Sequence, residues 1–137
     1  MPRIKKKSEG PEYTLHIAPA FVEREQKYKT RFTLETTKLF ASFRYDLSVR
    51  EELQEKTVRY TILGLKPPEL SLPAAGRAQF TRTYDGLRGK YDVEIEGLDG
   101  RVNTFSVKIA PTKIQLLKEP TSRFIDIIVG KAPTSTI

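Results

Sequence analysis

The sequence predicts an all-β domain, an antiparallel sandwich of about eight or nine strands. Three observations support this prediction. Apolar and polar residues alternate in short runs along the chain, turn-forming residues separate the runs, and no helical crossover joins them. The 137 residues suffice for one domain with a continuous core, and the seven Phe and six Tyr suit the packing of rings against a pleated surface.

The clearest pair of strands lies within Tyr84–Ile109. Apolar residues alternate with charged residues over 90–96 and with polar residues over 102–109, which gives each run one apolar face. Between the runs, Gly100 can adopt a positive φ without steric cost, and Asp99 can hydrogen-bond the backbone of the turn. The sequence therefore predicts a β-hairpin.

The other strands show the same period of two. In chain order, the predicted runs are 13–17, 28–35, 41–49, 58–65, 78–84, 114–117 and 124–129. A helix competes only at Ser48–Lys56, because Ser48 and Glu51 have the spacing of a capping box; we expect a polar connection with one helical turn at most. Three prolines within 66–76 predict a crossing loop between two sheets.

The net charge of +7 is concentrated near the N-terminus. Four of the 24 basic residues lie within 3–7, and the rest of the chain, with 20 basic and 17 acidic residues, has a net charge of only +3. A nucleic-acid-binding body would more often show a concentrated basic stripe. We expect 1–11 to be a flexible basic segment, 12–130 a single sandwich domain and 131–137 a frayed end.

The composition also limits the chemistry and the location of the protein. Without cysteine there is no disulfide framework, thiolate nucleophile or zinc–thiolate site, and we predict no cofactor. No apolar stretch approaches the length of a membrane span, and the basic start of the chain is not followed by the apolar run of a signal peptide. If Met1 is the natural start, we expect a cytoplasmic protein without membrane association.

One segment resembles a known family. Residues 87–95, Leu-Arg-Gly-Lys-Tyr-Asp-Val-Glu-Ile, resemble bacterial immunoglobulin-like domains. The resemblance implies an immunoglobulin-like sandwich in which Tyr91, shortly after Gly89, is a tyrosine corner whose hydroxyl bonds to nearby backbone. The chain lacks the Cys pair and core Trp of antibody domains, and residues 112–130 extend beyond the usual final strand.

No residue is predicted to act in catalysis or to bind a metal. His16, the single histidine, falls on the polar side of the first strand, where a surface position is the simpler interpretation. Three carboxylates share one face of a later strand: Asp92, Glu94 and Glu96. Paired carboxylates perform acid–base chemistry when a pocket raises one pKa, but here we expect them to lie outward and to be neutralised by Arg101 or Lys108.

Basic residues form the main candidate site. Two groups are candidates for contact with an anion: Lys5, Lys6 and Lys7 in the tail, and Lys27, Lys29 and Arg31 on the polar face of the second strand. For the strand face, a solvated sheet surface that discourages edge pairing is the simpler interpretation, and for the tail a soluble segment is the more common one. Arg82 and Asp126 differ from these, because each interrupts an apolar alternation; either a bulge exposes them or they form ion pairs in the core.

These observations predict a non-catalytic module for protein–protein interaction or scaffolding, because functions on such rigid frames reside on loops and exposed faces. We expect an unidentified protein partner at the loops 51–56 and 66–76, and self-association through the apolar end strands within 114–129. The alternative is binding of nucleic acid or another polyanion through the basic tail and the Lys27–Arg31 face. A third interpretation, a sugar- or small-ligand-binding β domain, requires a concave site with exposed rings.

Overall fold

The computed structural model describes residues 12–40, 46–67 and 76–131, without the side chains of 39, 40, 76 and 77. These residues form nine strands: β1 Tyr13–Val22, β2 Lys27–Phe40, β3 Asp46–Gln54, β4 Thr57–Lys66, β5 Gly76–Tyr84, β6 Gly89–Glu96, β7 Val102–Ala110, β8 Lys113–Lys118 and β9 Ile125–Val129. The predicted flexible segment 1–11, most of the predicted crossing loop and residues 132–137 lie outside the described residues.

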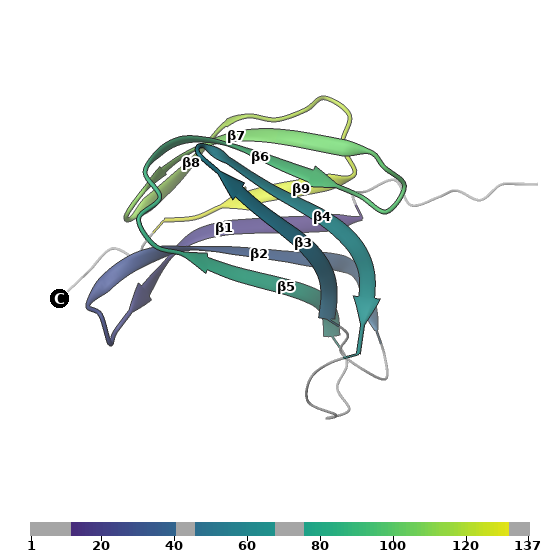
Figure 1. Ribbon diagram of the computed structural model, residues 1–137, viewed down its shortest axis with the longest axis horizontal. Helices are drawn as coiled ribbons and strands as arrows, with labels where there is room; N and C mark the ends of the chain where they lie inside the picture. The colour runs from purple at the N-terminus through teal and green to yellow at the C-terminus, as the bar shows by residue number, and fades with distance from the viewer. Residues whose placement is uncertain (1–11, 41–45, 68–75, 132–137) are drawn as a thin grey trace, which may run out of the picture.

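The all-β class is confirmed, and the nine strands form one nearly closed, barrel-like sheet (Figure 1). The strand order is β8-β7-β6-β4-β3-β5-β2-β1-β9. Three of its pairings are parallel, namely β1 with β9, β3 with β5 and β4 with β6. The prediction that all strands pair antiparallel is wrong for these three pairs. The physical reason is that β5 leaves β4 to pair with β2, so β6 returns to β4 through a crossover instead of a hairpin.

Two groups of strands enclose the core, β9-β1-β2-β5 on one side and β3-β4-β6-β7-β8 on the other (Figure 1). They meet at two narrow places. Asp46 of β3 pairs with Gln79 of β5, and Lys113 of β8 forms a bridge to Lys131. The largest fully buried side chains come from both groups: Leu15, Ile17, Phe32, Leu34, Val58, Tyr60, Ile62, Val93, Ile95, Phe105, Ile109 and Ile125.

The predicted hairpin is confirmed as the antiparallel pair β6 and β7. Its turn closes with a hydrogen bond of 3.1 Å from the Gly100 amide to the Gly97 carbonyl, and Gly100 has a φ of +88°. Asp99 accepts the amide of Arg101 at 3.1 Å, as its position in the turn predicts. Glycine at 97 also permits close packing, because a Cβ there would lie 3.1 Å from Cε2 of Phe124.

The prediction for Ser48–Lys56 is wrong, because this segment forms most of β3 and a tight turn instead of a polar loop with a helical turn. β3 pairs with β4 up to Gln54 and Thr57, and only Glu55 and Lys56 separate the two strands. Glu55 adopts a φ of +47°, a conformation usually reserved for glycine or asparagine, so the sequence shows no hairpin signal. Pairing with an apolar neighbour outweighs the weak helical preference of a short segment.

Candidate protein-binding site

The predicted basic face is largely neutralised by local ion pairs. Lys27 contacts Asp85 at 2.9 Å, and Glu25 contacts Lys29 at 2.9 Å. The hydrogen bond from Lys27 lowers the pKa of the Asp85 carboxyl below its usual value. Arg31 is exposed on the same face and has no ion pair with a described residue. Lys5, Lys6 and Lys7 lie outside the described residues.

The acidic face of β6 is neutralised by a residue that the sequence did not indicate. The guanidinium of Arg59 contacts Glu94 at 2.6 Å and Glu96 at 2.7 Å, because parallel pairing of β4 with β6 places Arg59 opposite Glu94. Asp92 accepts the hydroxyl of Ser106 at 3.0 Å. The expectation that Arg101 or Lys108 neutralises these carboxylates is therefore wrong. His16 lies 3.2 Å from Glu35 on the surface.

Tyr91 is buried in the core, but its hydroxyl forms no hydrogen bond with a described residue. Its ring instead lies beneath the ammonium of Lys56, which is 4.6 Å from the ring centroid and donates to the Arg88 carbonyl at 2.6 Å. Gly89 has a φ of +94°, and a Cβ there would lie 3.6 Å from the Lys56 Nζ. In place of the hydroxyl-to-backbone bond of a tyrosine corner, Tyr91 has a cation–π contact with the β3–β4 turn.

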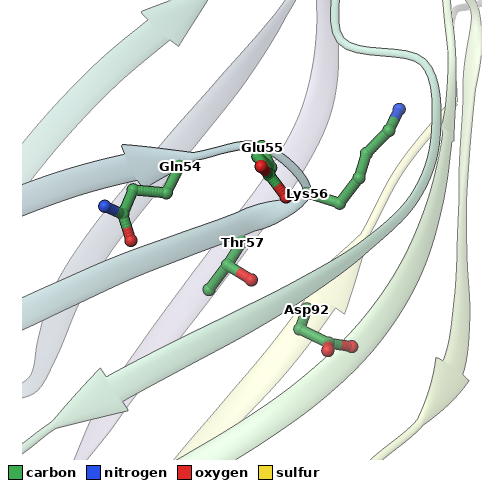
Figure 2. A pocket seen from close by; sticks show the side chains of 5 residues that line it. All are labelled: Gln54, Glu55, Lys56, Thr57 and Asp92. Carbon is green, nitrogen blue, oxygen red and sulfur yellow. The ribbon is translucent and has the colours of Figure 1, made fainter.

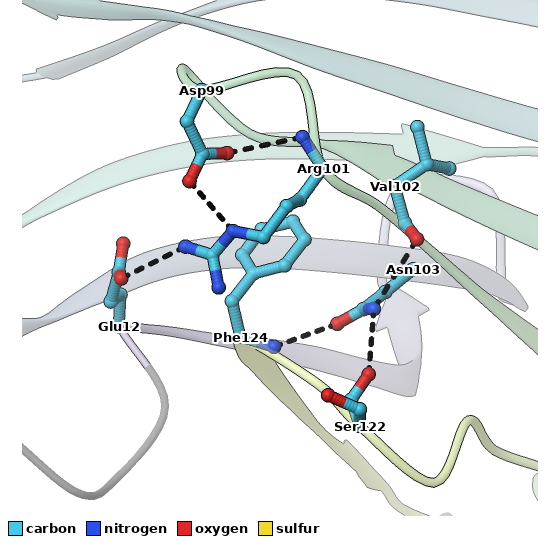
Figure 3. Close-up of polar contacts among 7 residues, drawn as sticks. All are labelled: Glu12, Asp99, Arg101, Val102, Asn103, Ser122 and Phe124. Atoms are coloured by element: carbon cyan, nitrogen blue, oxygen red, sulfur yellow. Dashed lines mark hydrogen bonds and ion pairs between the residues drawn. The ribbon is translucent and has the colours of Figure 1, made fainter.

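One end of the barrel is closed by a cluster of polar contacts around Phe124 (Figure 3). Arg101 lies over the Phe124 ring, 4.9 Å from its centroid, and contacts Asp99 at 2.6 Å and Glu12 at 3.1 Å. Asn103 is buried, and its side-chain oxygen accepts the Phe124 amide at 2.9 Å. These contacts fix the segment before β9 against the β6–β7 hairpin; we call this region the closed end.

A hollow of about 540 Å³ lies beside the β3–β4 turn (Figure 2). Its lining consists of Gln54, Glu55, Lys56, Thr57 and Asp92. The side chain of Lys56 extends away from the other four, so the polar groups do not converge on a common point (Figure 2). Ligand pockets are mostly apolar with a few convergent polar groups, and this hollow lacks that arrangement.

The strongest candidate for a binding site lies between β3 and β5. The two strands pair only at Asp46 and Gln79, and beyond that point they diverge (Figure 1). We call the region between the two diverging strands the side opening; its inward-facing residues on β3 and β5 are Glu51, Leu53, Phe80, Arg82 and Tyr84. The pairing register shows that they face inward, because residues opposite each other in an antiparallel pair share one face of the sheet.

Inward-facing residues at the side opening are nevertheless exposed. Leu53 is opposite Val58 and Arg82 is opposite Phe32, and both opposing residues are fully buried. Leu53 is 43% exposed and the Arg82 side chain 48% exposed, because no strand covers the gap in front of them. The interruption of the apolar alternation at Arg82 therefore marks the position where the barrel wall is open.

Polar contacts cross the side opening on its inner face. Glu51 of β3 accepts the Arg82 Nε at 2.6 Å and the Tyr84 hydroxyl at 2.6 Å. The Tyr60 and Tyr84 hydroxyls lie 3.1 Å apart. Burial is the main cause that raises the pKa of both phenols. The hydrogen bond with Tyr84 raises the pKa of Tyr60 further, and the hydrogen bond to Glu51 does the same for Tyr84, so both remain protonated at neutral pH.

Arg82 and Asp126 are not a buried ion pair. Arg82 contacts Glu51, whereas Asp126 contacts Arg123 at 3.2 Å with its side chain 44% exposed. The hypothesis of charges paired in the core is overturned for both residues. Both residues are charged because their side chains reach solvent, and neither belongs to a buried network. Exposed ion pairs such as these contribute little to stability.

Aromatic rings form the floor of the side opening. Tyr60 packs edge-to-face against Phe80 at 5.1 Å and against Phe32 at 6.0 Å, and Phe32 packs likewise against Tyr84 at 5.3 Å. At the narrow end of the opening is a hollow of about 260 Å³, lined by Asp46, Leu47, Lys66, Gln79, Phe80, Thr81 and Arg82. It is smaller than the roughly 300–1,000 Å³ of typical small-molecule pockets.

Comparisons of the chain with family models, with curated proteins and with solved structures gave no match. Within 12–40, 46–67 and 76–131, no three His, Cys, Asp or Glu side chains are grouped so that they could hold a metal ion. The same residues contain no helix that is long and apolar enough to cross a membrane.

Proposed function

We propose that the chain is a non-catalytic protein-binding module whose partner docks at the side opening. The observation that supports this proposal is the exposure of Leu53 and Arg82 on the inward face of their strands. Residues on this face are normally covered by a neighbouring strand, and contiguous apolar surface without cover marks interaction sites. The partially exposed rings of Phe80 and Tyr84 add the aromatic surface that protein interfaces favour.

Site-specific photo-crosslinking in cells tests the proposal. A photoreactive phenylalanine analogue at Leu53 should form a crosslink to a protein partner, because position 53 lines the side opening. The matched control is the same analogue at Thr104, which is exposed on the outer face of β7. Crosslinks from Thr104 alone, or the same products from both positions, would contradict docking at the side opening.

We also propose that the frame is a variant of the immunoglobulin-like sandwich. The two facing groups of strands and the buried Tyr91 support this relationship. The parallel pairing of β4 with β6 differs from an antiparallel sandwich. Self-association through the end strands is a further part of the proposal: β8 and β9 leave Leu117 and Ile128 half exposed. Light scattering of a Leu117→Ser and Ile128→Ser double variant tests it through loss of a dimer.

Binding of a polyanion is the second candidate function. A hollow of about 180 Å³ is lined by Lys27, Lys29 and Arg88 among others, which supports it. Glu25 and Asp85 already occupy the two lysines, which weakens it. Retention on heparin that falls steeply with salt and with the Lys27→Glu and Lys29→Glu changes would favour this candidate over the first.

A further inference from the structure

The edge of β5 that faces the side opening presents unused backbone hydrogen-bonding groups. Along an antiparallel strand, alternate residues direct their N–H and C=O groups to opposite sides. The Ala78 amide donates to the Thr36 hydroxyl on β2 at 3.1 Å, so the even-numbered residues face β2. The odd-numbered Thr81 and Thr83 therefore face the side opening, where their amides have no backbone partner among the described residues.

A contact of Arg82 agrees with this direction. Its Nη1 donates to the Thr81 carbonyl at 3.3 Å, so at Thr81 the amide, and not the carbonyl, is the unused group of this edge. The Nε of the same guanidinium is held by Glu51. Both side chains belong to the inward faces of their strands, so their ion pair crosses the side opening on that face.

The hollow at the narrow end of the opening indicates the chemistry of an occupant. Leu47 and Phe80 give it an apolar wall. Its charged residues are Lys66, Asp46 and Arg82, and the charge of Arg82 is balanced by Glu51. Lys66 is exposed and forms no ion pair with a described residue, so its ammonium is available to an incoming carboxylate.

We propose that the occupant of the side opening is an extended segment of a partner protein that adds as a strand to the free edge of β5. An apolar side chain of this segment enters the hollow beside Phe80, and an adjacent Asp or Glu contacts Lys66. Main-chain hydrogen bonds to Thr81 and Thr83 supply affinity, and the hollow supplies specificity, as in other cases of strand addition. This inference rests on the proposed function, and it names the form and charge of the partner.

A phage-displayed library of random nine-residue peptides, selected on the full chain, tests the inference. Enriched peptides should alternate apolar and polar residues and contain Asp or Glu. Thr81→Pro removes the edge amide without interrupting the ladder to β2, and it should weaken binding about tenfold. Thr81→Val keeps the amide and the branched shape, and binding should be unchanged.

A charge reversal makes the test independent of the proline variant. Selection on Lys66→Glu should replace Asp and Glu in the enriched peptides by Lys or Arg. Failure to enrich any peptide, equal binding to the Thr81→Pro variant when its circular dichroism is unchanged, or no charge exchange on Lys66→Glu would each overturn the inference. If crosslinks from Leu53 to a protein persist after such a result, the partner presents a folded surface, and the proposed function stands without strand addition.

Discussion

Two arginine–phenylalanine pairs in this molecule have nearly the same local geometry and different surroundings. Arg101 lies 4.9 Å from the ring centroid of Phe124 at the closed end, and Arg82 lies 4.8 Å from that of Phe80 at the side opening. Each guanidinium also contacts a carboxylate at 2.6 Å, from Asp99 or Glu51. The two sites therefore share the same cation, ring and anion.

The difference lies in what covers the ring. Phe124 is 3% exposed, because Tyr13, Gly97 and Arg101 surround it and Asn103 fixes its backbone. Phe80 remains partly exposed, since β3 diverges from β5 in front of it. The comparison shows that an Arg–Phe contact does not itself create a core position. Coverage by a second element determines whether the ring stabilises the fold or remains available to a partner.

Removing the phenylalanine ring should give the largest difference in stability between the two sites. Phe124→Ala should lower the free energy of unfolding by about 3–5 kcal/mol, as for other buried phenylalanines. Phe80→Ala should lower it by only about 1–2 kcal/mol, because its ring is already partly hydrated. Urea denaturation of both variants measures the difference. Equal losses would show that the side opening is as well covered as the closed end.

The buried amide at the closed end should give the next largest effect. Asn103→Ala leaves the buried Phe124 amide without its acceptor, and we expect a loss of about 1–3 kcal/mol in unfolding free energy. Thr104→Ala, one residue further and exposed, is the control and should change little. A loss no larger than that of Thr104→Ala would mean that water replaces Asn103 as the acceptor of the Phe124 amide. The closed end would then be accessible to solvent.

High pH should act on the side opening through its two phenols. The folded-state pKa values of Tyr60 and Tyr84 are raised, so stability is fully present below the unfolded-state pKa of about 10 and decreases as pH rises above it. For the buried Tyr60, the decrease should approach about 1.4 kcal/mol per pH unit.

Urea denaturation at several pH values between about 8 and 11, a range that brackets the ordinary tyrosine pKa, measures this slope. Tyr60→Phe should flatten it, because the variant has no group to ionise there. An unchanged slope in Tyr60→Phe would assign the alkaline sensitivity to another region.

The smallest expected effect concerns the ion pair across the opening. Glu51→Gln should cost less than about 1 kcal/mol, because the Arg82 guanidinium is half exposed and exposed pairs contribute little. Glu52→Gln, on the opposite face of β3, is the matched control and should be neutral. A loss as large as that of Asn103→Ala would show that this pair holds the two groups of strands together.

The comparison also separates what the sequence revealed at each site. At the closed end, Asp99 and Gly100 predict the hairpin turn, because local backbone requirements select these residues. At the side opening, Arg82 was the one visible signal, an exposed charge within an apolar alternation. The sequence predicts a loop at its partner Glu51, because the turn between β3 and β4 places Glu55 at a positive φ, and glutamate is not a residue that indicates such a turn.

The sequence by itself determined most of the strands and their apolar faces, β3 beyond Val49 excepted, because a period of two is a local property of the backbone that needs no knowledge of distant partners. It also determined the β6–β7 hairpin, where the two strands are adjacent in the chain. Only the tertiary structure decided that β4 pairs with β6, that Arg59 neutralises Glu94 and that β3 and β5 separate beyond one residue pair. These pairings depend on the relative free energies of alternative long-range arrangements. Strands with a similar alternation look alike in local sequence, so the sequence pattern does not show which strand pairs with which.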